Sequence, residues 1–401
     1  MKLGIIREEK LPHDKRVPFT PVQCKYLLEE YPELQIAVQP SPYRCYSDDE
    51  YRKHGILLQE DMSDCDLLMG VKEVPVDYLI SGKKYLFFSH TIKKQQHNKK
   101  LLRAILDKKV NLVDYECLVD ESEHRVIGFG RYAGLVGAYN GIMAYGMKYG
   151  LFELKPAHLC HDKKEMYREL ERISLPNLKI VVTGGGRVAN GALEILGVLG
   201  LRKVTSYEFL HYSFREAVYV QLHSEDYYRS KDGSPFSNQE FYHHPENFDC
   251  NFASSNSFAG LCDLLIHCTF WDPKASVLFT KEQMRDPKFR ISVIADVTCD
   301  INGSIPSTSR ASTIEEKFYG YNPNTERIEE PFAPSTITVM AIDNLPCELP
   351  RDASEGFGKH LMERVMPFLI KGDDGLIARA TIAKEGVLQP KFEYLSEWVN
   401  S

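Results

Sequence analysis

The run Leu178-Lys-Ile-Val-Val-Thr183 leads directly into Gly184-Gly-Gly186-Arg-Val-Ala189-Asn-Gly191. The apolar part is typical of a buried strand, and Leu193–Leu199 beyond the glycines has helical spacing. Strand, Gly-x-Gly-x-x-Ala and helix in this order indicate a turn that binds a dinucleotide. Bare glycines let the backbone approach a pyrophosphate, whose charge is favoured at a helix N-terminus. The residues expected to hold the cofactor here are Gly184, Gly185, Gly186, Arg187 and Val188.

Glu208 follows the glycine cluster by about 24 residues, after Lys203-Val-Thr-Ser-Tyr207, where a second strand is predicted to end. A carboxylate at that place would bind the ribose hydroxyls of the dinucleotide. It would also repel a 2′-phosphate and so favours NAD, whereas Arg187 or Arg202 would accommodate the phosphate of NADP. We therefore predict NAD or NADP as the cofactor, with a slight preference for NAD.

Short apolar runs recur along the rest of the chain, separated by charged stretches with helical spacing such as Lys93–Lys109. This alternation favours α/β layers built on parallel sheets. The apolar runs predicted to be strands are Leu3–Ile6, Asp66–Val71, Tyr85–Phe88, Val110–Val113, Leu261–Thr269, Ile291–Val297 and Ile337–Ile342.

A chain of 401 residues is long enough for two domains. We predict two Rossmann-like domains, with parallel sheets flanked by helices and an active-site cleft between them. Residues 1–135 and 345–401 would form a discontinuous catalytic domain, because the helical tail is expected to pack back on the first part. Residues 136–344 would bind the dinucleotide. The polar, Tyr- and His-rich segment 213–256 is interpreted as an insertion.

Composition excludes several classes of function. The net charge of −7, without a run of Lys or Arg, removes the basis for binding nucleic acid. The N-terminus becomes charged before an apolar segment reaches the length of a signal peptide or a membrane span, so we expect a cytoplasmic protein without a membrane partner. The ten cysteines are dispersed and lack metal-ligand spacing, which predicts reduced thiols and no metal site.

Ionisable side chains follow three successive predicted strands of the first domain. They are Lys72 and Glu73, then His90 and Lys93, and finally Glu116. Strands end in polar residues for structural reasons, so each residue alone is as often a simple strand end as a functional group. The ends of parallel strands, however, meet at one edge of a sheet. Oxidation of an amine needs a base for the nitrogen and a group that activates water; Lys72 and His90 are chemically suited.

Arginine forks bind carboxylates in pairs of hydrogen bonds, and Arg16, Arg125 and Arg131 are candidate anchors for an amino acid or keto acid. Any one of them alone is more often a solvated surface charge. On the cofactor side, Asp296 and Asp343 follow predicted strands, although Asp is also common in turns. We rank Asp343 above Asp296 as a residue of the cleft.

Segments in the same order resemble one family, the saccharopine dehydrogenases of the lysine-forming type. The nearest likeness is to the lysine–2-oxoglutarate reductase domain of animal aminoadipic semialdehyde synthases, and alanine dehydrogenase and the transhydrogenase α subunit are similar more distantly. Besides the glycine cluster, the segments are Arg16-Val-Pro-Phe-Thr-Pro21, Gly70-Val-Lys-Glu-Val-Pro75, Phe88-Ser-His-Thr-Ile-Lys93, Asp114-Tyr-Glu116, Gly128-Phe-Gly-Arg-Tyr-Ala-Gly134, Asp296-Val-Thr-Cys-Asp300 and Ile342-Asp-Asn-Leu-Pro346.

The resemblance implies hydride transfer between the glutamyl α-carbon of saccharopine and nicotinamide, with hydrolysis of the imine to lysine and 2-oxoglutarate. It implies that Lys72 is the acid–base group at the amine and that His90 serves water. By the same resemblance Glu73 and Glu116 tune these two groups. Arg16 and Arg125 would hold carboxylates, and Lys93 and Asp343 would line the cleft.

Two departures from the pattern matter. Asn344 stands where the fungal branch has His, and the reductase branch uses NADP despite an acidic residue that matches Glu208. Two alternatives also stay open: an alanine or other amino-acid dehydrogenase that releases ammonia, and a nucleotide-binding regulatory protein without turnover. The second is disfavoured because Lys72 and His90 are both present.

Overall fold

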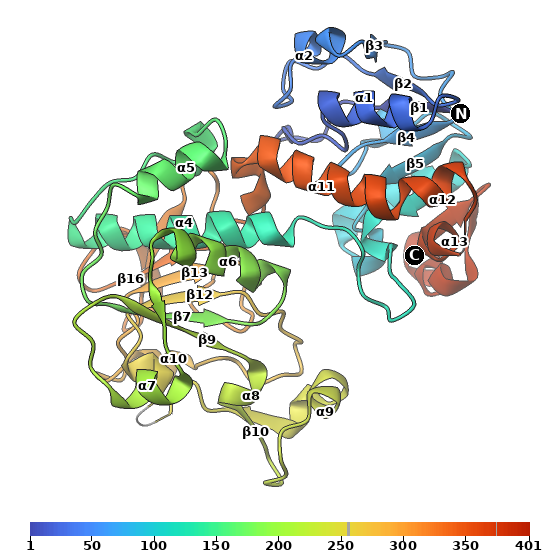
Figure 1. Cartoon of the computed structure of the whole chain (residues 1–401). Helices are drawn as coiled ribbons and strands as arrows, with labels where there is room; N and C mark the ends of the chain where they lie inside the picture. The colour runs from blue at the N-terminus through green and yellow to red at the C-terminus, as the bar shows by residue number, and fades with distance from the viewer. Residues whose placement is uncertain (255–256, 374) are drawn as a thin grey trace. The chain divides into compact units, whose positions relative to one another are not determined.

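The computed structural model describes residues 1–254, 257–373 and 375–401, and the chain divides into two units (Figure 1). Unit 1 comprises Met1–Phe129 and Pro350–Ser401, and unit 2 comprises Gly130–Leu349. Each unit is built on an eight-stranded, mostly parallel sheet that is flanked by helices. The predicted α/β fold class is therefore confirmed.

The sheet of unit 1 has the order β18-β17-β6-β5-β4-β1-β2-β3. The first six strands along the chain are parallel, whereas β17 and β18 are antiparallel additions from the C-terminal part. The strands are β1 (Lys2–Ile5), β2 (Gln35–Val38), β3 (Leu57–Leu58), β4 (Leu67–Met69), β5 (Lys84–Phe87), β6 (Asn111–Asp114), β17 (Thr381–Lys384) and β18 (Val387–Leu388). The helices are α1 (Pro21–Glu30), α2 (Asp48–Lys53), α3 (Lys99–Asp107), α11 (Pro350–Arg364), α12 (Met366–Ile370), α13 (Leu376–Ala380) and α14 (Ser396–Asn400).

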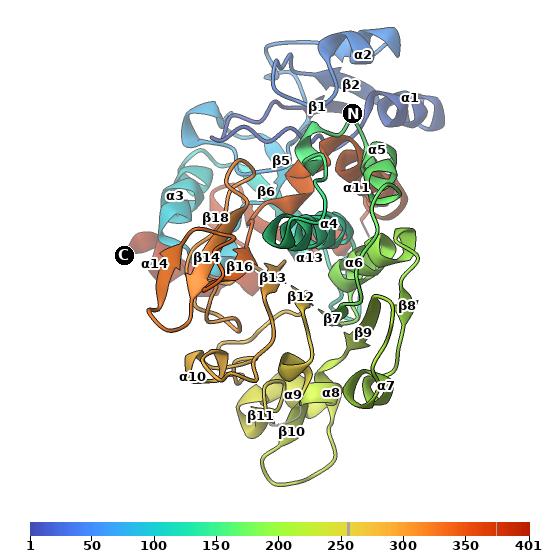
Figure 2. The same cartoon turned by 90° about the vertical axis from the view of Figure 1, so that its left-hand side faces the viewer.

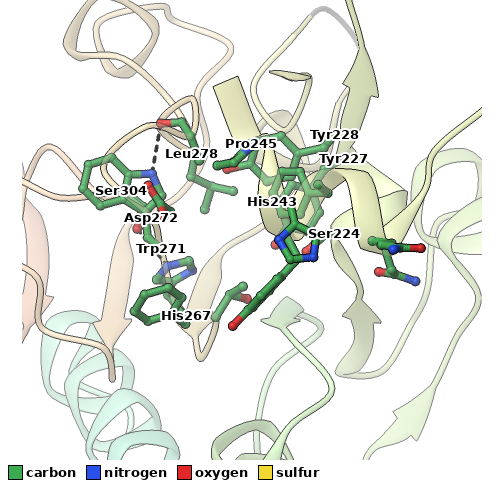
Figure 3. A pocket seen from close by; sticks show the side chains of 17 residues that line it. Ser224, Tyr227, Tyr228, His243, Pro245, His267, Trp271, Asp272, Leu278 and Ser304 are labelled. Carbon is green, nitrogen blue, oxygen red and sulfur yellow. Dashed lines mark hydrogen bonds between the residues drawn. The ribbon is translucent and has the colours of Figure 1, made fainter. Parts of the chain in front are cut away.

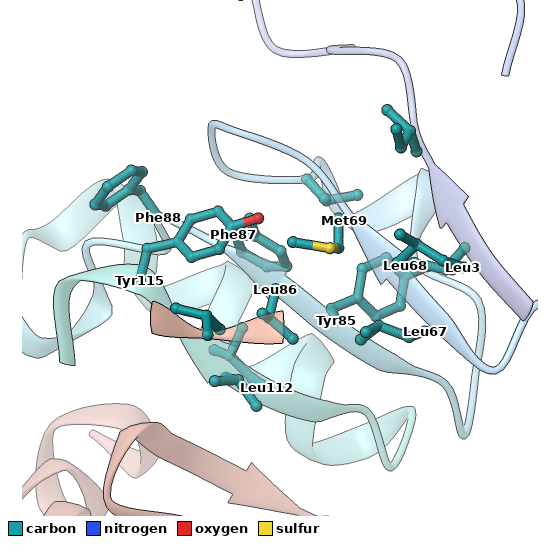
Figure 4. Packing of buried hydrophobic residues seen from close by; sticks show 14 of the residues in the cluster. Leu3, Leu67, Leu68, Met69, Tyr85, Leu86, Phe87, Phe88, Leu112 and Tyr115 are labelled. Atoms are coloured by element: carbon teal, nitrogen blue, oxygen red, sulfur yellow. The ribbon is translucent and has the colours of Figure 1, made fainter. Parts of the chain in front are cut away.

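The central strands of unit 1 are apolar on both faces because helices cover both sides of a parallel sheet. All three residues of β4 are buried, and Tyr85, Leu86 and Phe87 of β5 are buried beside them (Figure 4). This core fixes the positions of the loops that leave the strand ends. Those loops carry the ionisable residues described below.

The sheet of unit 2 has the order β15-β14-β16-β13-β12-β7-β9-β8, with β14 and β15 antiparallel to the rest. A separate two-stranded antiparallel sheet, β10-β11, and the helix α9 between its strands in sequence extend from it (Figures 1 and 2). The strands are β7 (Lys179–Thr183), β8 (Arg202–Lys203), β9 (Val218–Leu222), β10 (Tyr228–Ser230), β11 (Phe248–Cys250), β12 (Leu264–His267), β13 (Val293–Asp296), β14 (Phe318–Asn322), β15 (Arg327–Glu329) and β16 (Ile337–Met340). The helices are α4 (Gly130–Tyr149), α5 (Lys163–Leu170), α6 (Arg187–Val198), α7 (Ser206–His211), α8 (Ser224–Tyr227), α9 (Asn238–His243) and α10 (Lys281–Met284).

Helices α4 and α6 touch through their backbones, and Figure 2 shows α4 nearly end-on with α6 beside it. A Cβ atom on Gly134 would lie 1.8 Å from the carbonyl oxygen of Val188, and one on Gly191 would lie 2.0 Å from that of Arg131. Glycine is therefore required at both positions of this crossing. The contact holds the first turn of α6 against the start of α4.

Two sequence expectations for unit 2 are wrong. The strand that pairs with β7 is β9, and the predicted second strand near Lys203 is only the two-residue edge strand β8. The segment 213–256 is not an insertion throughout, because β9 within it is part of the main sheet. Its last two residues, 255 and 256, lie outside the described residues. In unit 1, the helix expected over Lys93–Lys109 begins only at Lys99, after two short 3-10 turns.

Candidate active site

Three neighbouring strands of unit 1 present the predicted catalytic groups. Lys72 and Glu73 follow β4, His90 and Lys93 follow β5, and Glu116 follows β6. Because β4, β5 and β6 are adjacent and parallel, their carboxyl ends lie along one edge of the sheet. The fold thus brings together side chains that are 44 positions apart in sequence, from Lys72 to Glu116.

Glu73 and His90 form the central pair of this edge. The Nδ1 of His90 lies 2.7 Å from Oε1 of Glu73, and Nζ of Lys10 lies 2.7 Å from Oε2 of the same carboxylate. Burial acts to raise the pKa of Glu73, but the hydrogen bond and charge of His90, with Lys10, lower that pKa to about 2. An ionised Glu73 accepts the Nδ1–H of His90, so the Nε2 of a neutral imidazole carries the lone pair.

Lys72 lies beside this pair on a loop that Glu8 holds. The two carboxylate oxygens of Glu8 accept the backbone N–H groups of Val71 and Lys72, at 2.6 and 2.9 Å. Burial, together with Asp14, raises the pKa of Glu8 to about 8, although the two amides act in the opposite direction. Among the residues that the structure describes, the ammonium of half-buried Lys72 has no hydrogen bond or ion pair.

Glu116 is paired with two cations at the end of β6. Its Oε1 accepts from Nη2 of Arg125 at 2.8 Å and lies 3.4 Å from Nζ of Lys93. Its Oε2 is buried and, within the described part of the chain, has no hydrogen-bond partner. Since a buried acceptor without a donor is costly, a donor from a bound molecule would stabilise it. Arg125 and Lys93 are exposed enough to reach such a molecule as well.

Arg16 is placed differently from what the sequence predicts. It is only 3% exposed, and two of its N–H groups donate to the carboxylate of Asp14, at 2.9 and 2.6 Å. Its guanidinium also lies over the ring of Phe129, 4.1 Å from the centroid. A guanidinium engaged in this way holds the segment after β1 in place.

Arg131 belongs to unit 2, unlike the residues described above. It lies in the first turn of α4 in unit 2, where it makes a bidentate ion pair with Glu194 of α6. The other predicted anchors, Arg16 and Arg125, belong to unit 1. Arg125 and Arg131 are close in sequence, but the boundary between the units falls between Phe129 and Gly130.

The glycine cluster of unit 2 forms the turn from β7 into α6. Gly184 has a φ of 93°, which only glycine adopts without strain. Gly185, Gly186 and Arg187 are exposed, and in the described residues no side chain caps the start of α6 at Gly186. The first-turn N–H groups of a 12-residue helix are therefore available to an anion. This is the geometry that a dinucleotide pyrophosphate needs.

The acidic residues predicted for the cofactor side are engaged elsewhere. Glu208 lies in α7 rather than at a strand end, and its carboxylate accepts from the N–H and hydroxyl of Thr205 in a capping box. Asp296 is 1% exposed, and its oxygens accept from Thr298, Cys299 and Thr308. The ribose role predicted for Glu208 and the cofactor role predicted for Asp296 are therefore not supported by their positions. Asp343 is exposed, just beyond β16.

Sequence reasoning missed three residues of this site: Glu8, Lys10 and Asp14. All three lie on the loop after β1, which is not adjacent to β5 or β6 in the sheet. The acidic and basic run Arg7-Glu-Glu-Lys10 at a strand end was a signal that could have drawn attention to this loop. Its partners are visible only in the folded chain.

The described residues lack two further features that other classes of protein have. No helix there is both long enough and apolar enough to cross a membrane. Within the same residues, no group of three or more His, Cys, Asp or Glu side chains has an arrangement that could hold a metal ion. The ten cysteines are free thiols.

Comparison with known proteins first defines the class. Residues 4–136 match the family model described as alanine dehydrogenase/PNT, N-terminal domain. A solved L-alanine dehydrogenase aligns over 100% of both chains with a TM-score of 0.66 and 15% identity. The transhydrogenase from Sinorhizobium meliloti aligns over 98% of this chain and 100% of its own, with a TM-score of 0.58 and 15% identity. The chain has the fold of these proteins.

More similar sequences narrow the relationship. Alpha-aminoadipic semialdehyde synthase of Arabidopsis thaliana is 28% identical over 98% of this chain and 41% of its own length. The mitochondrial enzyme of that name from Mus musculus is 27% identical, over 98% and 47%. Saccharopine dehydrogenase (NAD(+), L-lysine-forming) of Emericella nidulans is 26% identical over 98% of both chains.

The homologues of this chain are thus saccharopine dehydrogenases and alpha-aminoadipic semialdehyde synthases, which confirms the resemblance seen in the sequence. The chain spans less than half the length of the two synthases and nearly the whole length of the fungal dehydrogenase.

Proposed function

We propose that this chain is a nicotinamide-dependent oxidoreductase that acts on the C–N bond of saccharopine, interconverting it with L-lysine and 2-oxoglutarate. The observation that carries the proposal is the Glu73–His90 pair beside Lys72, whose ammonium is unpaired among the described residues. The printed names of the homologues support saccharopine as the substrate.

The chemistry that a bound nicotinamide supplies is hydride exchange with the glutamyl α-carbon of the substrate. Lys72 takes or returns the proton of the secondary amine, because its Nζ has no competing partner in the described residues. The Nε2 of His90 takes a proton from the water that attacks the imine carbon, since Nδ1 is committed to Glu73. Each step thereby has its own base.

The charged groups around this pair have separate tasks in the proposal. Arg125 and Lys93 hold substrate carboxylates, leaving Glu116 when the substrate enters. Arg16 acts as a positioning residue, because its guanidinium already donates to the carboxylate of Asp14. In unit 2, the bare turn Gly184–Gly186 and the N–H groups of Arg187 and Val188 hold the pyrophosphate.

The proposal is tested by an assay of the purified chain with NAD and NADP in turn, following nicotinamide absorbance. Three substrate sets are offered: saccharopine, lysine with 2-oxoglutarate, and alanine or pyruvate with ammonium. We expect turnover with saccharopine and with its two products, and the comparison of NAD with NADP measures the cofactor preference. Turnover with the alanine set alone would show that the enzyme releases ammonia and that the saccharopine assignment is wrong.

A further inference from the structure

Buried hydroxyl groups form hydrogen-bonded networks in both units. In unit 2, each ring nitrogen of His267 lies 2.9 Å from a hydroxyl oxygen, one of Thr183 and the other of Ser304. His267 and Ser304 line a cavity of about 780 Å³, and Thr183 directly precedes the turn already proposed to hold the cofactor (Figure 3). The network of unit 1 is closed instead, because its three members are fully buried.

The network of unit 1 centres on Asp114, the last residue of β6. In the sheet, Asp114 lies beside Phe87, the last residue of β5. Its Oδ2 accepts the backbone N–H of Ser89 at 3.0 Å and also accepts the hydroxyl of Ser89. Its Oδ1 accepts the backbone N–H of Glu116 at 2.7 Å. One carboxylate therefore joins the loop after β5 to the turn after β6.

Thr91 extends this network to the other side of His90. The N–H of Thr91 donates to Oγ of Ser89 at 3.3 Å, and the two hydroxyl oxygens are 2.8 Å apart. Because the hydroxyl hydrogen of Ser89 is used by Asp114, the Thr91 hydroxyl donates to Ser89. Both neighbours of His90 in the chain are thus tied to one carboxylate, and His90 itself has a φ of 52°.

The energetics of Asp114 fit a task in holding its surroundings. A buried carboxylate is costly unless donors surround it. Burial raises the pKa of Asp114, whereas the hydrogen bonds from Ser89 and from the Glu116 amide lower it. A left-handed residue such as His90 is also costly and persists only where its surroundings hold it. Asp114 is 0% exposed, so it has no surface for a substrate and can act on a reaction only through its neighbours.

We propose that Asp114 is a positioning residue that sets the places of the His90 imidazole and the Glu116 carboxylate at the sheet edge. The inference rests on the proposed function, in which His90 acts on water and the cations beside Glu116 hold substrate carboxylates. One arm runs through Ser89 and Thr91, and the other is the amide of Glu116. Loss of the first arm should lower kcat, and loss of the second should raise KM.

Thr91→Val tests the arm to His90, since valine has the shape of threonine without its hydroxyl. We expect kcat with saccharopine to fall by roughly tenfold to a hundredfold at unchanged KM, the effect of a small displacement of an acid–base group. Thr91→Ser keeps the hydroxyl and should restore kcat to near the wild-type value. Thr338→Val removes a buried hydroxyl of β16 in unit 2 and should keep the wild-type rate. An equal fall in all three variants would overturn the proposal.

A double-mutant cycle shows whether the network acts through His90. In the His90→Gln background, Thr91→Val should leave the residual kcat unchanged, because no imidazole is left to position. A purely structural role would lower kcat by the same factor in both backgrounds, and that result would also overturn the proposal.

Asp114→Asn tests both arms together. The amide keeps the size of the carboxylate but replaces one acceptor with a donor, so one arm must lose its hydrogen bond. We expect kcat to fall as in Thr91→Val, or KM for saccharopine to rise by roughly twofold to tenfold, the worth of about one hydrogen bond. Wild-type kcat and KM in this variant would contradict the proposal. The Thr91 variants keep the carboxylate, so the cycle decides even where Asp114→Asn does not fold.

The same measurements separate this inference from the proposed function. If the wild-type chain turns over saccharopine and His90→Gln is impaired, but the Thr91→Val and Asp114→Asn variants are not, the positioning role fails while the proposed function stands. If the wild-type chain acts on none of the substrate sets, the proposed function fails. The positioning role fails with it.

Discussion

His90 adopts a left-handed backbone conformation, with a φ of 52°, that only a few per cent of residues other than glycine adopt. Such strain persists where the surroundings over-determine the residue, and it is frequent at functional sites. Here the ring is held by Glu73 and lies parallel to the ring of Phe88, 6.2 Å between centroids. With this backbone conformation, the imidazole lies against Glu73, on the loop that also carries Lys72.

Removal of either proposed base should abolish most of the turnover. Lys72→Met and His90→Gln should each lower kcat by about a hundredfold or more, because an acid–base group is lost. The control variants Lys100→Met and His97→Gln, at exposed positions of unit 1 away from the pair, should retain wild-type rates. Steady-state kinetics with saccharopine checks this, and near-normal rates in the first two variants would reject the roles assigned to them.

Glu73→Gln tests the fixed tautomer of His90. A neutral amide no longer requires the proton on Nδ1, so we expect kcat to fall by about tenfold or more. The substitution also removes a carboxylate whose pKa is depressed to about 2 by His90 and Lys10. Relative to the usual value of about 4.3, that depression stabilises the folded state above pH 4.3 and is lost as the pH falls toward 2.

The stability of the Glu73→Gln variant should therefore fall furthest below wild type at pH 6, and the difference should shrink on acidification. Urea unfolding at pH 6, 5, 4 and 3 measures the free energy of unfolding of both proteins. A difference that stays constant or grows as the pH falls would contradict the ionised state of Glu73.

Several of these residues were accessible to sequence reasoning, and others were not. Lys72, His90 and Glu116 could be predicted because each follows an apolar run, and the ends of parallel strands share an edge. The sequence predicts a substrate carboxylate as the partner of Arg16, because it does not reveal that the Arg16 guanidinium donates to Asp14. Glu8 and Lys10 were missed because their partners lie about 63 positions away along the chain.

At the scale of elements, the crossing of α4 and α6 is the most constrained contact of unit 2. No side chain fits between Gly134 and Val188 or between Gly191 and Arg131. The crossing fixes the first turn of α6, and this turn carries the amides that are proposed to hold the pyrophosphate. Packing of two helices therefore positions the turn that is proposed to hold the cofactor.

Gly134→Ala should destabilise the protein by about 3 kcal/mol or more, because the added methyl group overlaps a carbonyl and the helices must separate. The matched control is Gly197→Ala in α6, where a Cβ atom would meet nothing within 4 Å. That change should stabilise the protein by about 1 kcal/mol through helix propensity. Denaturant unfolding of the two variants checks both signs, and similar stabilities would show that the crossing tolerates side chains.

The strand β9 shows why local patterns fail at this scale. Val218-Tyr-Val-Gln-Leu222 alternates in burial and is surrounded by polar, aromatic sequence, so the local pattern predicts an insertion there. In the fold it pairs with β7 along its whole length. The residue at its carboxyl end, His223, contacts the glycine turn, whereas Glu208 is used to cap α7.

At the scale of the whole molecule, the two ligands of the proposed reaction are assigned to different units. The turn proposed to hold the pyrophosphate belongs to unit 2, and the proposed bases belong to unit 1. Because each unit has its own sheet and its own core, each set of residues is positioned independently.

Hydrogen exchange followed by mass spectrometry tests this division. A saturating dinucleotide alone should slow exchange in the peptide that covers Gly184–Val198, because a bound pyrophosphate orders the first turn of α6. Addition of saccharopine to a nonreactive complex should then slow exchange around residues 70–73 and 88–93. Protection of the unit 1 segments by dinucleotide alone, without an effect on α6, would contradict the assignment.

The α/β class, the glycine turn before α6 and the relatives of this protein were determined by the sequence alone, because they depend on local patterns. Apolar runs, glycine spacing and short motifs are each read within a few residues. Which charges pair and which strand lies beside β7 in the sheet were decided only by the tertiary structure. The physical reason is that an ion pair such as Glu73 with Lys10, or a strand pair such as β7 with β9, depends on distances that burial of the core sets between remote segments.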